Sequence, residues 1–343
     1  MTNLLKNIAR TPSKRLTTWM LAIGAATVGA AAIVQERSRN AERNNPPIGK
    51  FVTVDGVRLH YVERGEGEPL VLLHGNTMMA LDFLLGDLVG MAARNHRVII
   101  FDRPGYGHSE RPRGRDWGPE AQAHLLHGAL LQIGVGNPVV LGHSWGSMVA
   151  LALALDHPGF VRSLVLESGY YYPTLRLDVP LASIQTVPVL GDLLRHTFSP
   201  LMARANWTLM VKGLFAPAKV PDYFWEFPAW MAFRPSQLQA LTDEGAEMVS
   251  AAERLSKRYG SLQVPAVIIA GTGDLVAHAR PHSVRLHAEL DRSELRLIEG
   301  MGHMLHHLVP YAVLDAIDTA ERLAPRAAVS LTPGSEDEDP LAA

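Results

Sequence analysis

Residues 138–146 read Pro138-Val139-Val140-Leu141-Gly142-His143-Ser144-Trp145-Gly146, and this stretch decides the fold. The β-branched run before the first glycine predicts a short buried strand, and the small apolar residues from Ser147 to Leu155 predict a buried helix. A G-x-S-x-G pattern between a strand and a helix is typical of a nucleophile elbow. The glycines allow the strand and the helix to approach closely, and the helix N-terminus favours developing negative charge. We therefore predict that Ser144 is a catalytic nucleophile.

The bulk composition is that of a large globular domain or of one domain with an inserted lid. The chain has 343 residues, of which 47% are hydrophobic, and a formal net charge of −2. A near-neutral charge without a basic stripe argues against nucleic acid as a partner. The absence of cysteine excludes disulfides, thiolate metal sites and a cysteine nucleophile.

The N-terminus is predicted to be separate from the folded domain. Residues 1–16 are basic without any acid, and residues 17–34 carry no charge over roughly 27 Å of helix, enough to cross a bilayer core. The positive-inside rule predicts a membrane anchor with residues 1–16 in the cytoplasm and the catalytic domain outside it, on the periplasmic side in a Gram-negative cell. The alternative is a signal peptide cleaved at the A-x-A site of residues 30–32, which gives a secreted or periplasmic protein.

The remaining chain divides into a linker, a two-part core, a cap and a tail. Residues 35–48 are interpreted as a linker and residues 326–343 as a disordered acidic tail. The core is predicted over residues 49–173 and 262–325, and the helical cap over residues 174–261, where no convincing strand pattern occurs.

The core pattern predicts an α/β fold with a mostly parallel eight-stranded sheet flanked by helices. Asp55-Gly56 between two alternating runs is a type I′ hairpin signal. The later apolar runs indicate strands covered on both faces. Strands are expected at residues 51–54, 57–62, 70–73, 98–101, 139–141, 164–166, 266–270 and 294–298, and helices at residues 81–95, 119–133 and 305–323.

A serine nucleophile needs a base, and that base needs an orienting carboxylate. Asp274 directly follows the strand predicted at residues 266–270, and His303 follows the strand predicted at residues 294–298. Since the carboxyl ends of parallel strands share one edge of a sheet, both side chains are expected to meet Ser144 there. Glu167 is a lesser candidate for the acid. His306 and His307 are expected to point elsewhere, either exposed or supporting the site from behind.

The turn His74-Gly75-Asn76 ends another buried strand and supplies a candidate oxyanion hole. Its residue Asn76 is expected to present a backbone N–H toward the serine, together with the N–H of Trp145. The Gly- and Pro-rich segment of residues 101–109 is interpreted as a structural loop behind the site.

With these residues in place, the chain resembles the α/β-hydrolase superfamily. It is most similar to the capped serine hydrolases that share a His-Gly-Asn turn, an Asp-Arg-Pro-Gly-x-Gly segment and a Gly-His-Ser-Trp-Gly elbow, and the resemblance covers about residues 50–325. It implies a cap inserted after the sixth strand. It also implies Ser144 as nucleophile, Asp274 as acid, His303 as base, and Asn76 and Trp145 as oxyanion donors.

The resemblance implies acyl transfer through an acyl-enzyme on Ser144, without a metal or an organic cofactor. Haloalkane dehalogenases share the His-Gly-Asn turn and epoxide hydrolases share the Gly-His-x-Trp-Gly elbow, but both families use an aspartate nucleophile, so the serine at position 144 counts against these activities. Ester cleavage is expected. A lactonase, an aminopeptidase, a cofactor-free perhydrolase or a carbon–carbon hydrolase would use the same triad, and a non-catalytic ligand-binding protein is a further alternative.

Aromatic residues crowd the predicted cap and suggest an apolar pocket lining suited to a small hydrophobic acyl substrate. The alternative is that most of these rings pack the core of the cap itself. The sequence leaves the oligomeric state open. The pocket candidates are Tyr170, Trp207, Phe224, Trp225 and Trp230.

Overall fold

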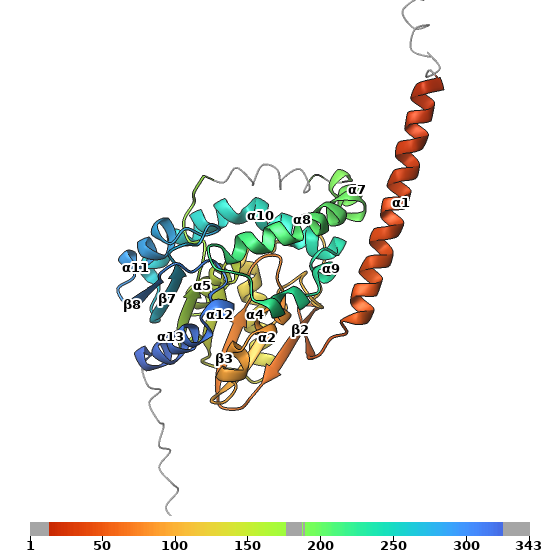
Figure 1. The fold of residues 1–343 in the computed structure, drawn as a ribbon. Helices are drawn as coiled ribbons and strands as arrows, with labels where there is room; N and C mark the ends of the chain where they lie inside the picture. The colour runs from red at the N-terminus through yellow and green to blue at the C-terminus, as the bar shows by residue number, and fades with distance from the viewer. Residues whose placement is uncertain (1–13, 176–186, 188, 325–343) are drawn as a thin grey trace, which may run out of the picture.

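The computed structural model describes residues 14–175, 187 and 189–324. Its centre is an eight-stranded sheet in the order β1-β2-β4-β3-β5-β6-β7-β8 (Figure 1). β1 pairs antiparallel with β2 and β2 with β4, and every other neighbouring pair is parallel. The strands are β1 (Lys50–Val54), β2 (Val57–Arg64), β3 (Glu68–Leu73), β4 (His96–Phe101), β5 (Val139–His143), β6 (Ser163–Glu167), β7 (Ala266–Gly271) and β8 (Ser293–Ile298).

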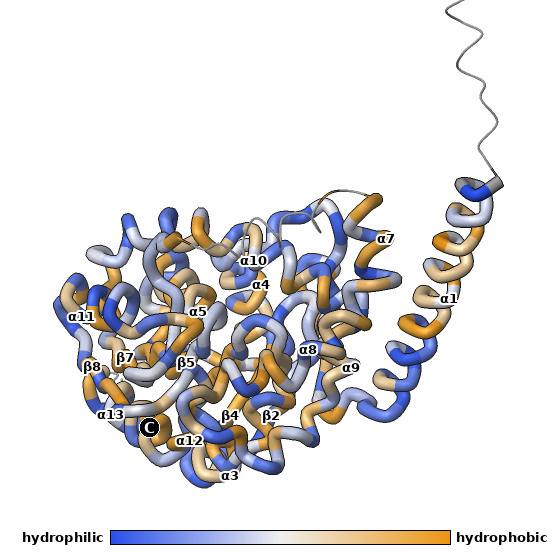
Figure 2. The backbone as a smooth tube through the Cα atoms, turned by 45° about the horizontal axis from the view of Figure 1, so that its top comes forward, coloured by the Kyte–Doolittle hydropathy of each residue, from blue (hydrophilic) through white to orange (hydrophobic). Residues whose placement is uncertain are grey.

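All eight expected strands are present, and the α/β-hydrolase fold is confirmed. Asp55 and Gly56 both have positive φ, 49° and 74°, as the predicted type I′ turn between β1 and β2 requires. The middle strands are apolar on both faces because helices cover both: Val71 and Leu73 belong to one buried cluster, while Leu70 and Leu72 belong to another. Figure 2 shows these strands as largely hydrophobic.

Helices α4 and α5 cover one face of the sheet, and α3 and α13 cover the other. The helix expected at residues 81–95 is two short helices, because Gly86 adopts an extended conformation and ends the first. The helix expected at residues 305–323 is also divided, at Pro310, whose ring cannot continue a helix. The core helices are α2 (Ala80–Leu85), α3 (Leu88–Ala92), α4 (Pro119–Gln132), α5 (Trp145–Asp156), η4 (Arg280–Val284), α11 (Arg285–Glu289), α12 (Leu305–Leu308) and α13 (Pro310–Leu323).

Between β6 and β7, where the helical cap is expected, the described residues form helices and no strand, and residues 176–186 and 188 of the expected range lie outside the described residues. The two ends of the insertion meet: the Tyr259 hydroxyl donates to the Tyr171 carbonyl at 2.9 Å, and the Tyr259 ring packs edge-on against Tyr172. The cap elements are α7 (Leu190–His196), α8 (Phe198–Phe215), η2 (Asp222–Glu226), α9 (Ala229–Ala232), α10 (Pro235–Ser256) and η3 (Tyr259–Ser261).

The N-terminal apolar segment belongs to one long helix, α1 (Lys14–Asn44). Among the described residues it is the one helix long and apolar enough to cross a membrane. The linker expected at residues 35–48 is mostly wrong, because the helix continues to Asn44, where Pro46 and Pro47 follow. These residues stay helical because Ala41 is buried against the cap and Glu42 pairs with Arg234 at 2.8 Å. Most of the basic segment 1–16 and the tail 326–343 lie outside the described residues.

Candidate active site

Ser144 lies at the sharp turn between β5 and α5. Its φ of 54° and ψ of −120° place a non-glycine residue in a strained backbone conformation, which is typical of functional turns. The neighbouring glycines are sterically required: a Cβ at Gly142 would overlap the carbonyl of Gly146, and a Cβ at Gly146 would overlap the carbonyl of Leu73. The sequence therefore folds locally so that the serine is presented at the N-terminus of a buried helix.

His303 and Asp274 meet at the carboxyl edge of the sheet. The ring Nδ1 of His303 lies 2.8 Å from Asp274 Oδ2, and both side chains are buried. Burial alone would raise the pKa of the Asp274 carboxyl, but the neighbouring His303 and the backbone N–H groups of Ala277 and Val276 outweigh it and hold this pKa below its usual range. Asp274 is thus ionised at neutral pH and fixes the orientation of the His303 imidazole. Because Nδ1 contacts Asp274, Nε2 is the ring nitrogen that can serve as the base.

A second contact joins the histidine segment to the elbow. His143, which immediately precedes Ser144, lies with its Nε2 3.1 Å from the carbonyl of His303. Burial lowers the pKa of His143 to about 3, so the ring is neutral and donates this hydrogen bond from Nε2. The loop that carries His303 is therefore tied directly to the turn that carries Ser144.

Ser144 and His303 line a common cavity of about 520 Å³. Asn76, Trp145 and Tyr170 also line it, so the structure brings the two oxyanion candidates and one pocket candidate beside the serine. Trp145 is the first residue of α5, a position whose backbone N–H has no partner within the helix. Most of the remaining wall is apolar and rich in methionine: Met78, Met148, Met210, Leu214, Leu241, Met248, Val276, Ala277 and Met304.

The other four aromatic candidates lie away from this cavity, so their prediction as pocket residues is corrected. Trp207, Trp225 and Trp230 line a separate depression between α1 and the cap. Phe224 is buried in the apolar core of the cap, where its ring packs against Phe215. Trp207 and Phe224 belong to the buried apolar cluster of the cap, and Trp230 packs against it, so these three rings contribute to the stability of the cap.

A buried ion pair joins the cap to the turn that carries Asn76. Arg103 follows β4 and Glu244 lies on α10; both are fully buried, and their nearest atoms are 2.6 Å apart. Arg103 also donates to the carbonyls of His74 and Gly75 at 2.8 and 3.2 Å. The hydroxyl of Tyr106 donates to Glu244 at 2.8 Å. A carboxylate supplied by the cap therefore pairs with the guanidinium that binds the candidate oxyanion turn.

This contribution is not evident from the sequence, in which residues 101–109 are interpreted as a structural loop and Glu244 is not among the candidate residues. Only a weak signal points to Glu244 as a residue that supports the site. Glu244 follows Leu241 and Thr242, which line the cavity, and so lies on a helix that faces the site.

A second buried network lies behind His303. Glu167 contacts His306 Nδ1 at 2.7 Å, and Asp82 contacts His306 Nε2 at 3.1 Å and His307 Nε2 at 2.9 Å. Both histidines are buried, so an exposed position is excluded, whereas a supporting one fits. Glu167 contacts His306 rather than His303, which leaves Asp274 as the acid partner of His303.

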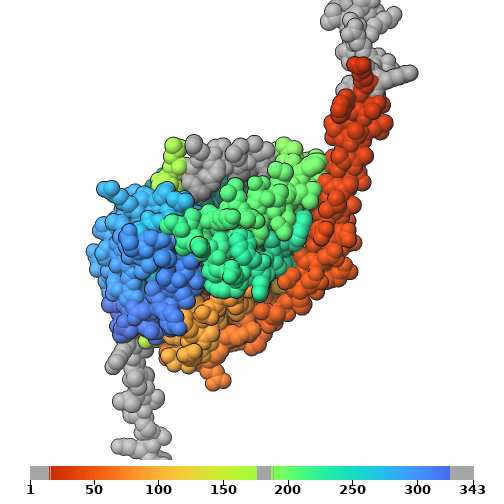
Figure 3. All heavy atoms as spheres, viewed as in Figure 1, coloured from red at the N-terminus to blue at the C-terminus, as the bar shows by residue number. Residues whose placement is uncertain are grey.

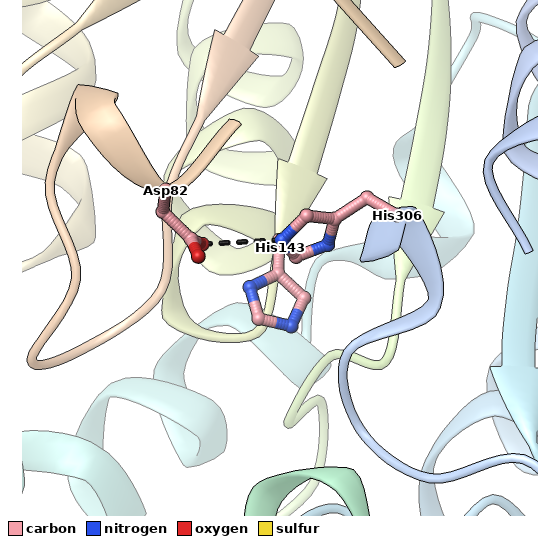
Figure 4. Close-up of side chains that lie close together, drawn as sticks. All are labelled: Asp82, His143 and His306. Atoms are coloured by element: carbon pink, nitrogen blue, oxygen red, sulfur yellow. Dashed lines mark hydrogen bonds and ion pairs between the residues drawn. The ribbon is translucent and has the colours of Figure 1, made fainter. Parts of the chain in front are cut away.

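The same network includes one of the two clusters of potential metal ligands found in the described part of the chain. Asp82, His143 and His306 each offer an atom within 4.8 Å of the others (Figure 4). Burial alone would lower the pKa of His306, but Glu167 and Asp82 outweigh it and raise this pKa to about 10. A metal requires a neutral imidazole. Both nitrogens of His306 already contact carboxylates, so the cluster fits a buried ion-pair network better than a metal site.

Comparison with known proteins defines the class. The alpha/beta hydrolase fold family matches residues 68–310, most of the chain, and the chain belongs to this family of hydrolases. An uncharacterized protein of Mycobacterium tuberculosis is 28% identical over 306 residues, covering 82% of this chain and 84% of that protein. The 2-hydroxymuconate semialdehyde hydrolase of Pseudomonas sp. (strain CF600) is 34% identical over 137 residues, covering 39% of this chain and 48% of the relative.

Solved structures share the fold over nearly their whole length. The epoxide hydrolase CorEH has a TM-score of 0.64 at 23% identity, covering 80% of this chain and 97% of that one. A membrane phospholipase A described as a bacterial virulence factor has a TM-score of 0.61 at 20% identity, covering 93% and 99% of the two chains. At these identities the likeness concerns the fold alone.

Proposed function

We propose that this protein is a serine hydrolase that cleaves an ester-type bond of a small hydrophobic substrate. The observation that carries the proposal is the strained Ser144 turn opening into the same cavity as His303, whose Nδ1 is held by the ionised Asp274. An epoxide hydrolase or a dehalogenase of the kind that needs an aspartate nucleophile does not fit a serine at this position.

The proposed reaction has two steps. His303 Nε2 accepts the proton of the Ser144 hydroxyl as the oxygen attacks the acyl carbon, and the oxyanion is stabilised by the backbone N–H groups of Asn76 and Trp145. The leaving alcohol departs with the proton from His303. Water then attacks the acyl-enzyme through the same base, which releases the acid and restores the serine.

The cavity wall supports an uncharged acyl group. Its described lining contains no lysine, arginine, aspartate or glutamate, and five of its residues are methionines, whose flexible side chains adapt to differently shaped apolar groups. Asn76, Thr77 and Thr242 add polar but uncharged side chains to the wall. An anionic substrate would lose its hydration there without gaining a countercharge.

A carbon–carbon hydrolase is the second candidate, and the partial match to the 2-hydroxymuconate semialdehyde hydrolase favours it. Both reactions would use the same triad. A lactonase, an aminopeptidase or a perhydrolase is tested in the same substrate panel.

Labelling with a fluorophosphonate tests the serine directly. The wild-type chain is expected to be labelled on Ser144, and Ser144→Ala is expected to lose the label and to lower turnover of a short p-nitrophenyl ester by ~10³-fold or more. Ser250→Ala, on an exposed position of α10, is the matched control and keeps both signals. Absence of an adduct in the folded wild-type protein would exclude the acyl-enzyme. A panel of esters, lactones, aminoacyl amides and a carbon–carbon substrate then identifies the bond.

We further propose that residues 17–34 of α1 anchor the protein in a membrane with the hydrolase domain outside the cytoplasm. The segment is uncharged and largely exposed, with Trp19 and Val28 about 70% accessible, which is unfavourable for a helix surrounded by water. N-terminal sequencing of the mature protein tests this: a start at Met1 or Thr2 fits an anchor, whereas a start near Ile33 identifies a cleaved signal peptide.

A further inference from the structure

We infer that the outer face of the cap, formed by α7 and α8, sits in the interfacial region of the lipid bilayer that α1 crosses. The inference rests on the proposed anchoring of α1, and it assigns a second membrane contact to the hydrolase domain itself. Three observations carry it: the level at which α1 contacts the cap, the exposed apolar side chains of α7 and α8, and the residues at the junction.

The cap contacts α1 inside the apolar segment. Ala30 and Val34 are 7% and 1% exposed, and Ala41 lies on the same side of the helix and is also buried. The most extensive contacts of helix α1 are with α7, α8 and α9. Because Ala30 is four residues inside the segment of residues 17–34, the cap reaches about 6 Å along it. A domain packed at that level cannot stand clear of the bilayer, and amphipathic elements typically enter it by ~5–10 Å.

Large apolar side chains are exposed on α7 and α8. Phe198, Met202 and Leu209 are 42%, 61% and 72% exposed, and their spacing of four and seven residues places them on one side of α8. The opposite side of α8 buries Trp207, Val211 and Phe215. On and before α7, Val189, Leu190 and Leu193 are exposed as well. Such a concentration of exposed large apolar side chains marks an interaction surface rather than ordinary solvent exposure.

The polar groups near this face fit a membrane interface. The acid on α7, Asp192, is paired with Arg113 and Arg195 at 2.8 and 2.7 Å, so its charge is compensated. The depression between α1 and the cap, about 400 Å³, is lined by Arg37, Arg204, Trp225 and Trp230 among others. Arginine and tryptophan are the side chains that favour the headgroup region.

The bilayer is the occupant that explains these features together. Figure 1 shows α7 and α8 at the end of the domain beyond which α1 projects, and Figure 3 shows α1 extending past the cap surface. A second copy of the chain could cover the exposed side of α8. It would not explain why the cap contacts α1 at Ala30, inside the apolar segment of residues 17–34. Helix α8 also lines the cavity through Met210 and Leu214, so it separates the bilayer from the catalytic serine, as suits an apolar substrate dissolved in lipid.

The absence of cysteine makes the test direct, since single cysteines can be introduced and labelled with an environment-sensitive fluorophore. Full-length chains with Met202→Cys or Leu209→Cys report on the cap face. Val28→Cys reports on α1, and Tyr311→Cys on α13 is the control on an exposed position of the core. Each labelled protein is reconstituted in phosphatidylcholine–phosphatidylglycerol vesicles with and without nitroxide-labelled lipid, and fluorophosphonate labelling of Ser144 checks that it is folded.

We expect nitroxide lipid to quench the probes at positions 28, 202 and 209 at least about twofold more than the probe at position 311. Quenching at position 28 with no more quenching at positions 202 and 209 than at position 311 would overturn the inference while leaving the anchor intact. A blue shift at positions 202 and 209 without lipid quenching would identify a protein partner, such as a second copy, and would also overturn it. Lack of quenching at position 28 would instead refute the anchor.

Discussion

Glu244→Gln is the substitution that best separates the role of the cap from that of the core. It removes a carboxylate whose oxygens lie 2.6 and 3.1 Å from the Arg103 guanidinium, with neither side chain exposed. Breaking a buried pair leaves an uncompensated charge and costs about 3–5 kcal/mol. We expect the near-isosteric amide to lie at the lower end of this range, lowering Tm by roughly 6–12 °C for a domain of this size.

The same change should reach the chemistry, because Arg103 contacts the candidate oxyanion turn. Its guanidinium donates to the Gly75 carbonyl at 3.2 Å and lies 3.4 Å from Asn76 Oδ1. Losing one oxyanion donor altogether costs ~10²–10³-fold in kcat. A displaced donor should cost less, so we expect kcat to fall by roughly tenfold or more with a smaller change in KM. Ester turnover well below Tm and chemical unfolding measure the two effects separately.

Glu120→Gln is the matched control. It removes the ion pair between Glu120 and Arg254, which also joins α10 to the core. The Arg254 Nε and Glu120 Oε1 atoms are 3.1 Å apart, and both side chains are partly exposed. Such pairs contribute about 0–1 kcal/mol, so stability and kcat should both stay near wild type. If Glu244→Gln loses stability but keeps wild-type kcat at a temperature where it is folded, the oxyanion turn does not depend on the cap and the reasoning is refuted.

Two further predictions concern the core. Because the pKa of His306 is raised to about 10, its ion pairs contribute fully to the free energy of unfolding below about pH 6.5, and this contribution should be lost as the pH rises through about 10. Asp82→Asn should move the loss to lower pH. A free energy of unfolding that stays constant from pH 7 to 10 in the wild-type protein would contradict this prediction. Gly146→Ala places a methyl group against the Leu73 carbonyl and should destabilise the fold by about 1–3 kcal/mol or more. Gly136→Ala is the control, because a methyl group there meets no atom within 4 Å, and it should not destabilise the fold. Equal melting temperatures of the two variants would count against the steric argument.

The sequence was most informative where function follows a local pattern. Ser144 and Asp274 follow the short buried strands β5 and β7, and His303 follows the partly exposed strand β8. Parallel strands bring positions after their carboxyl ends to one edge whatever the details of packing. The Arg103–Glu244 pair joins residues 141 positions apart, and no local pattern fixes which cap residue reaches Arg103.

The aromatic residues of the cap and the length of α1 also could not be predicted from local sequence patterns. A ring that lines a cavity and a ring that fills a helical layer occur in the same kind of sequence, so Trp207 and Phe224 could not be assigned from composition. Residues 35–44 are polar enough for a linker but are held in a helix by tertiary contacts such as the Glu42–Arg234 ion pair. In both cases, packing between distant segments decides the outcome.

The meeting of Tyr171 with Tyr259 has an evolutionary consequence. Because the insertion leaves and re-enters the sheet domain at one place, its length and sequence can change without altering the strand order on either side. A descendant could therefore acquire a different lid by recombination at this single junction while inheriting the elbow intact. The hydrogen bond between the two tyrosines marks where a chimera between related hydrolases should be joined.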